Sequence, residues 1–130
     1  MTLAQLQGAT LVTRELGSGS RKIVEQAFER AGLKLREMHV RMTFDSTEGL
    51  LSAVEAGLGV AFVSRWAVRA QLALGTLRVA RVKGLELGRV FAVVTAAGPE
   101  PVGVVGAFRR FVLERAEGLA PRATGRARER

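Results

Sequence analysis

The first half of the chain switches between two spacings of hydrophobic residues. A short β-branched and apolar run at 9–15, ATLVTRE, predicts a strand, and apolar residues at helical spacing over 21–31 predict a helix that ends at Gly32. Apolar and polar positions alternate over 35–44, which predicts a half-buried strand, before helical spacing returns over 46–58. The apolar side of that second strand would carry Met38, Val40, Met42 and Phe44. Strands that alternate with helices favour an α/β fold with right-handed crossovers.

The second half of the chain continues the alternation. The continuous apolar run GVAFVS at 59–64 predicts a strand buried on both faces, and 65–75 returns to helical spacing up to a terminal glycine. Two further strands are expected at 76–82 and 89–97, followed by a last amphipathic helix after the breaker GPEP. The core-facing side of that helix would carry Val104, Val105, Phe108, Phe111 and Val112.

Composition narrows the class of protein. The chain has 130 residues, 48% of them hydrophobic, which is enough for one globular domain with a real core. It has no cysteine, so a disulfide framework and a thiolate metal site are excluded, and a reducing, cytoplasmic location is expected. The single histidine, His39, argues against a histidine-based metal site or catalytic triad. The sequence starts without a secretory signal pattern, and no apolar run is long enough to cross a membrane.

The net charge of +8 is unevenly distributed. The last twelve residues, LAPRATGRARER, hold four arginines and one glutamate, and the remaining positive charge is spread along faces that alternate with apolar ones. The predicted arrangement is therefore a solvated basic surface followed by a disordered basic tail over 118–130. Nucleic-acid binding through this chain is the less favoured interpretation, because no interleaved aromatics or reading helix accompany the arginines.

Hydroxyl groups cluster at two expected joints between a strand and the helix that follows it. Ser18 and Ser20 flank Gly19 at the first joint, and Ser46 and Thr47 stand at the second. In an open α/β sheet these joints lie at the carboxyl ends of the strands, where helix N–H groups attract anions. The alternative is that the hydroxyls only cap their helices. Two such joints facing one cleft would favour a ligand site.

Motifs for catalysis are missing. The run GSGSRK has neither the spacing of a phosphate loop nor that of a dinucleotide fingerprint, and no G-x-S-x-G nucleophile elbow occurs. His39 falls on the polar side of a predicted strand, where an exposed position without a catalytic role is expected. We therefore expect a binding protein that is not an enzyme, with no catalytic residues, no metal and no cofactor.

Four motifs in a fixed order make the chain resemble a known family. They are RELGSGSR at 14–21, DSTEGLLSAVEAGLGVAFVSRWAV at 45–68, LALGTL at 72–77 and GAFRRFV at 106–112. Together they resemble the effector-binding domain of LysR-type transcriptional regulators, over roughly residues 6 to 115. The resemblance implies an α/β fold similar to one lobe of a type II periplasmic binding protein, with a mixed sheet flanked by helices.

The resemblance also implies how the chain is divided and where a ligand would bind. Residues 1–75 would form most of the second lobe, and 76–117 would return to a first lobe whose opening strands are not visible, leaving apolar surface exposed. A cleft between the lobes would bind a small polar or anionic effector, with Val63 and Ser64 near the crossover. Its ligand-binding residues would be Ser18, Gly19, Ser20, Ser46, Thr47 and Ser64.

The expected partners follow from the same resemblance. DNA would be bound only through an N-terminal domain of the parent regulator, which is not seen in this sequence, and the parent is expected to be a homo-oligomer. Two alternatives remain open from the sequence: a solute-binding protein of the type II periplasmic class, and a basic nucleic-acid-binding protein. No membrane partner is expected.

Overall fold

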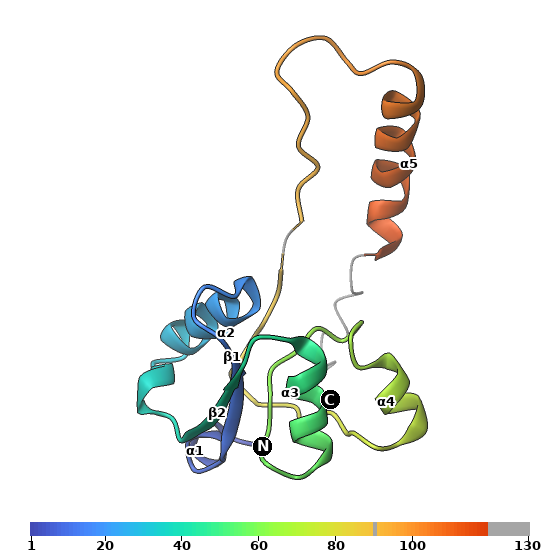
Figure 1. Cartoon of the computed structure of the whole chain (residues 1–130). Coiled ribbons are helices and arrows are strands. Elements are labelled where there is room, and N and C mark those ends of the chain that lie inside the picture. The colour runs from blue at the N-terminus through green and yellow to red at the C-terminus, as the bar shows by residue number, and fades with distance from the viewer. Residues whose placement is uncertain (90, 120–130) are drawn as a thin grey trace, which may run out of the picture. The chain divides into compact units, whose positions relative to one another are not determined.

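The computed structural model describes residues 1–89 and 91–119 (Figure 1). The chain divides into two compact units, Met1–Arg89 and Val90–Arg130, and each is considered by itself. Most of the predicted basic tail lies outside the described residues. No described helix is long and apolar enough to cross a membrane.

The first unit follows the predicted alternation of strands and helices in its first half. Its elements are α1 (Leu3–Gln7), β1 (Leu11–Arg14), α2 (Gly19–Arg30), the 3-10 helix η1 (Leu35–Glu37), β2 (Val40–Phe44), α3 (Thr47–Glu55) and α4 (Arg69–Leu74). The strand predicted at 9–15 and the helices predicted at 21–31 and 46–58 are confirmed as β1, α2 and α3. An α/β fold with a parallel sheet is thus present.

The two strands run parallel, and their register brings their carboxyl ends together. Leu11 pairs with Val40 at one end and Arg14 pairs with Phe44 at the other. The backbone N–H of Glu15 continues the pairing by donating to the carbonyl of Phe44 at 2.9 Å. Because both strands end at the same edge, the loops that lead into α2 and α3 begin side by side.

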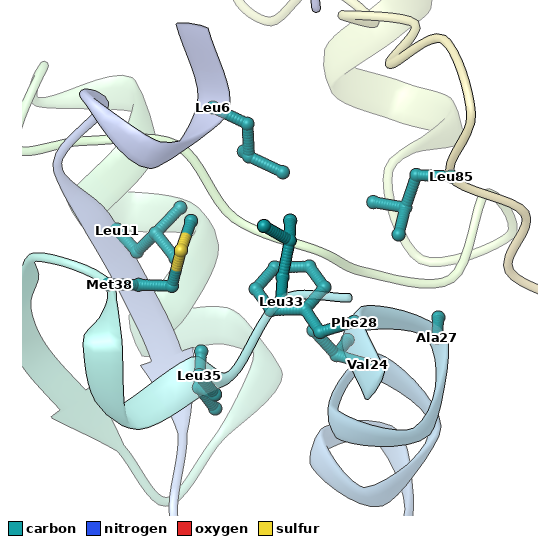
Figure 2. Close-up of a cluster of buried hydrophobic side chains, with 9 residues drawn as sticks. All are labelled: Leu6, Leu11, Val24, Ala27, Phe28, Leu33, Leu35, Met38 and Leu85. Atoms are coloured by element: carbon teal, nitrogen blue, oxygen red, sulfur yellow. The ribbon is translucent and has the colours of Figure 1, made fainter. Parts of the chain in front are cut away.

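Successive residues of β1 are buried on opposite sides of the strand. Leu11 belongs to a cluster with side chains of α2, including Phe28, which is fully buried (Figure 2). Val12 is also buried but lies outside that cluster, as do Leu50 and Leu51 of α3. Since neighbouring side chains of a strand point to opposite faces, α2 and α3 cover opposite sides of β1. In Figure 1 the two helices flank the strands.

The strand predicted over 35–44 is shorter than expected. Its first part forms η1, in which the N–H of Glu37 donates to the carbonyl of Lys34 and that of Met38 to Leu35. Met38 is buried as predicted, but it precedes the strand, and Met42 is 44% exposed. The alternation therefore reflects a turn and an edge strand with only part of its apolar side covered.

The three later strands that the pattern predicted are absent from the described residues. Over 59–64 only Val60 joins the sheet, through an isolated parallel bridge to Leu11. The described residues of 76–82 and 89–97 form no strand. The helix predicted at 65–75 is reduced to α4 and ends at Gly75, whose φ of 74° forms a left-handed cap. A β-branched run becomes a strand only where a partner strand meets its backbone along its length. Among the described residues, 59–64 meets β1 only at Val60, and the runs at 76–82 and 91–97 pair with no strand.

The described part of the second unit, 91–119, forms one helix, α5 (Gly103–Leu119). An ion pair of 2.8 Å joins Arg109 to Glu100 in the segment before the helix. The apolar side chains predicted to face a core are instead exposed, with the exception of the half-buried Val112: they are Val104, Val105, Phe108 and Phe111. The prediction that they face a core is wrong in this structure, whereas the predicted exposure of apolar surface in the segment after residue 75 is observed.

Candidate functional site

A small cavity of about 50 Å³ lies at the carboxyl edge of the two strands. The first residues of α2 and α3 reach it, so helix N–H groups that lack an intrahelical acceptor are close by. Its wall is formed by residues from β1, α2, α3 and the segment after Val60: Arg14, Ser20, Thr47, Leu50, Phe62, Val63, Ser64 and Ala67. All of these residues lie in the first unit.

Arg14 is the charged residue of this wall, and its guanidinium ties the two strand ends together. Nη2 donates to the carbonyl of Asp45 at 2.9 Å, just after β2, and Nη1 donates to Oγ1 of Thr47 at 3.1 Å, the first residue of α3. The carbonyl of Arg14 accepts a bond of 3.1 Å from Nη1 of Arg21 in α2. Arg14 thus fixes the starts of both helices relative to β1.

The same guanidinium forms an ion pair with its neighbour in the chain. Nε donates to Oε2 of Glu15 at 2.8 Å and Nη2 donates to Oε1 at 3.0 Å. This hydrogen-bonded pair raises the pKa of Arg14 and lowers the pKa of Glu15. The side chain of Arg14 is 20% exposed and that of Glu15 is 37% exposed, so the pair lies at the protein surface beside the cavity.

Three hydroxyl residues that the sequence predicted as ligand-binding line this cavity. Ser20 comes from the first turn of α2, Thr47 begins α3, and Ser64 ends the apolar run that follows α3. Ser64 is held in a turn, because its Oγ accepts the N–H of Trp66 at 3.3 Å and its carbonyl accepts the N–H of Ala67 at 3.0 Å. Residues from both hydroxyl-rich joints therefore meet at one place.

The other three predicted ligand-binding residues lie elsewhere. Ser46 is the N-cap of α3, with its Oγ accepting the N–H of Gly49 at 3.1 Å. Ser18 is the N-cap residue of α2 but its side chain makes no capping hydrogen bond, and it is buried with 8% exposure. Gly19 does not line the cavity, and a Cβ added to it would lie 3.7 Å from Nη2 of Arg89. These positions support the helix starts that surround the cavity.

Sequence reasoning assigned no binding role to Arg14, although Arg14 opens the motif RELGSGSR. The sequence feature that could have indicated this role is a cation directly at the end of an apolar strand, because ligands of open α/β sheets bind at the carboxyl ends of the strands. Phe62 was also missed. It lines the cavity, and its ring packs edge-on against the ring of Phe28, with the two ring centroids 5.4 Å apart. The described residues contain no group of histidine, cysteine or carboxylate side chains that could hold a metal ion.

Comparison with known proteins identifies the family. A model described as LysR substrate binding domain matches residues 1–117, nearly the whole described chain. The chain belongs to this family. This LysR domain therefore has the periplasmic-binding-protein-like α/β fold of its family, and the resemblance drawn from the four sequence motifs is confirmed.

Relatives of this LysR domain include transcriptional regulators. It is 34% identical over 125 residues to the HTH-type transcriptional regulator CbbR of Xanthobacter flavus, covering 96% of this chain and 37% of that protein. It is 37% identical over 110 residues to a RuBisCO operon transcriptional regulator of Acidithiobacillus ferrooxidans, covering 85% and 35% of the two chains. The chain thus spans about a third of the length of these regulators.

A relative with a different name also matches. The Phosphonates import ATP-binding protein PhnC of Anaeromyxobacter dehalogenans (strain 2CP-C) is 40% identical over 97 residues, which are 75% of this chain and 20% of that protein. The two regulators share longer alignments with the LysR domain, and their names agree with the family match.

Proposed function

We propose that this LysR domain binds a small oxygen-rich ligand, polar or anionic, in the cavity beside Arg14. The observation that carries the proposal is the position of the Arg14 guanidinium in the wall of a cavity that Ser20, Thr47 and Ser64 also line. A guanidinium and hydroxyl groups are donors suited to carboxylate, phosphate or hydroxyl oxygens. The nearby starts of α2 and α3 add the favourable ends of two helix dipoles.

The cavity is large enough for only one part of a ligand. Its volume of about 50 Å³ accommodates a group of a few atoms, whereas complete small-molecule sites are typically hundreds of cubic ångströms. We propose that the cavity holds the charged or hydroxylated end of the ligand, and that the rest lies in a cleft completed by a second lobe. In that setting the segments at 76–82 and 91–97 would pair with strands of that lobe to give a mixed sheet. The apolar side chains of α5 would then be covered.

In the intact regulator, ligand binding at this site would control transcription. We propose that the intact protein binds DNA through a separate domain, as the name HTH-type transcriptional regulator suggests for its relative in Xanthobacter flavus. We also propose that it acts as a homo-oligomer. We propose that the protein is a sensor and not an enzyme, because its function requires no chemical step on the ligand.

A titration followed by NMR tests the site directly. The 130-residue chain, labelled with ¹⁵N, would be titrated with inorganic phosphate and with acetate, using chloride at matched ionic strength as the control. The backbone signals of Ser20, Thr47 and Ser64 should shift together and saturate with one dissociation constant. Shifts that do not saturate, or that concentrate elsewhere in the chain, would contradict the proposal.

A further inference from the structure

Most hydrogen-bond donors of Arg14 are already engaged before any ligand arrives. In a guanidinium, Nε carries one N–H and each terminal nitrogen carries two. Glu15 accepts from Nε and from Nη2, the carbonyl of Asp45 accepts from Nη2, and Oγ1 of Thr47 accepts from Nη1. Among the described residues, one N–H on Nη1 is left without an acceptor.

Glu15 occupies the edge of the guanidinium that another anion would use. A carboxylate or a phosphate is bound most strongly when two of its oxygens accept from two parallel N–H groups of one arginine. The Nε and Nη2 donors that form such an edge bond to Glu15 at 2.8 and 3.0 Å. The negative charge of Glu15 also cancels the positive charge of Arg14 beside the cavity.

The side chain of Glu15 can be changed without removing the hydrogen bond that joins its position to β2. The carboxylate pairs with the adjacent residue in the chain, and it is more exposed, at 37%, than its partner. The connection of this position to β2 is made by the backbone N–H, which donates to the carbonyl of Phe44. A glutamine at this position keeps the backbone bond and the shape of the side chain but removes the charge.

We propose that Glu15 is a specificity-determining residue, which holds the paired donors of Arg14 and so makes the site favour hydroxylated or singly charged groups over dianions. This inference rests on the proposed ligand site. A ligand group in the cavity meets a neutral ion pair, one N–H of Arg14 and the hydroxyls of Ser20, Thr47 and Ser64. A dianion additionally meets the repulsion of the Glu15 carboxylate, which a singly charged or neutral group feels less.

The test compares Glu15→Gln with a matched control, Glu25→Gln. Glu25 also forms an ion pair of 2.8 Å with an arginine Nε, that of Arg21, and has a similar side-chain exposure of 35%. Both variants raise the net charge of the chain by the same amount. They differ in the arginine that is released, because Arg14, the partner of Glu15, lines the cavity and Arg21, the partner of Glu25, does not. General attraction of anions to a more basic protein should therefore appear equally in both.

The probes are inorganic phosphate at about pH 8, where it is mainly a dianion, and acetate, which is singly charged. In Glu15→Gln the dissociation constant for phosphate should fall at least about threefold relative to the unmodified chain, the size expected for removing one partly exposed charge. The constant for acetate should change less, so the preference between the two anions should shift toward phosphate. In Glu25→Gln both constants should stay within about twofold of the unmodified chain.

Two results would overturn the inference while leaving the ligand site intact: an unchanged preference in Glu15→Gln, or an equal change in Glu25→Gln. In either case the unmodified chain still shows saturable shifts at Ser20, Thr47 and Ser64. If neither the unmodified chain nor Glu15→Gln shows saturable shifts there, the proposed site itself fails together with the inference.

Discussion

Nη1 of Arg14 donates a hydrogen bond of 3.1 Å to Oγ1 of Thr47, although 33 positions separate the two residues in the chain. The bond joins the end of β1 to the first residue of α3, across the edge where both strands finish. It positions two potential ligand donors, a guanidinium and a hydroxyl, within the wall of one cavity.

Replacing Thr47 by valine tests this contact. Valine has nearly the same shape but offers no acceptor, so the N–H of Arg14 loses its partner, and the free energy of unfolding should fall by about 1 kcal/mol. Phosphate affinity should also weaken, because the ligand loses a hydroxyl donor. Urea denaturation and the NMR titration measure the two effects, and Thr47→Ser, which keeps the hydroxyl, should remain close to the unmodified chain in both.

The two serines that precede α2 and α3 should differ in their effect on stability. Ser46 makes a capping hydrogen bond to the N–H of Gly49, so Ser46→Ala should lower the free energy of unfolding by about 1 kcal/mol. Ser18 makes no side-chain capping bond, so Ser18→Ala should cost less than about 0.5 kcal/mol. Urea denaturation measures the free energy of unfolding of both variants, and equal decreases would show that the capping assignment is wrong.

Gly59 should not tolerate a side chain. A Cβ at this position would lie 2.6 Å from the carbonyl oxygen of Thr10, which itself accepts the N–H of Val60. Gly59→Ala should therefore lower the free energy of unfolding by about 2 kcal/mol or more, because backbone has to shift to relieve the contact. Gly88→Ala is the matched control, since its Cβ would meet nothing within 4 Å. Similar melting temperatures for the two variants would contradict this close approach.

Stability should decrease in acid through Glu15. Its pKa is lowered in the folded protein, first by the hydrogen bond from Arg14 and then by its own backbone. The ion pair therefore stabilises the fold above the unfolded-state pKa of Glu15, and this contribution is lost as the pH falls through the folded-state pKa. Carbon-detected NMR titration should show a depressed midpoint for the Glu15 carboxyl, and Arg14→Gln should move that midpoint upward. An unchanged midpoint in Arg14→Gln would rule out the pair as the cause.

The elements that the sequence predicted correctly are those fixed by nearby residues. In α2 the apolar spacing places Val24, Ala27 and Phe28 on one buried side, and the structure confirms it. The short apolar run of β1 is likewise buried, at Leu11 and Val12. The helix α2 requires only its own periodicity and one covering layer, whereas β1 also needs the pairing with β2 that the structure supplies.

The strands that were predicted wrongly depend on partners that local sequence does not specify. The run over 76–82 has the same β-branched character as β1, yet in this structure it meets no neighbouring strand. The role of Arg14 was missed for a related reason, because it arises from Thr47 and Asp45, more than thirty positions away. Among the serines at the two joints, Ser46 caps its helix, whereas Ser20 lies in the first turn of α2 and lines the cavity. Side chains of one type at similar joints thus take different positions, which depend on their place relative to the helix start.

The wall of the cavity is assembled from residues between Arg14 and Ala67, one uninterrupted stretch of the chain. A single exchange of the corresponding gene segment between two members of the family would transfer every described residue of the cavity wall, along with the two helix starts that support it. Under the proposed function, recombination would exchange recognition of the charged or hydroxylated end of the ligand in one step.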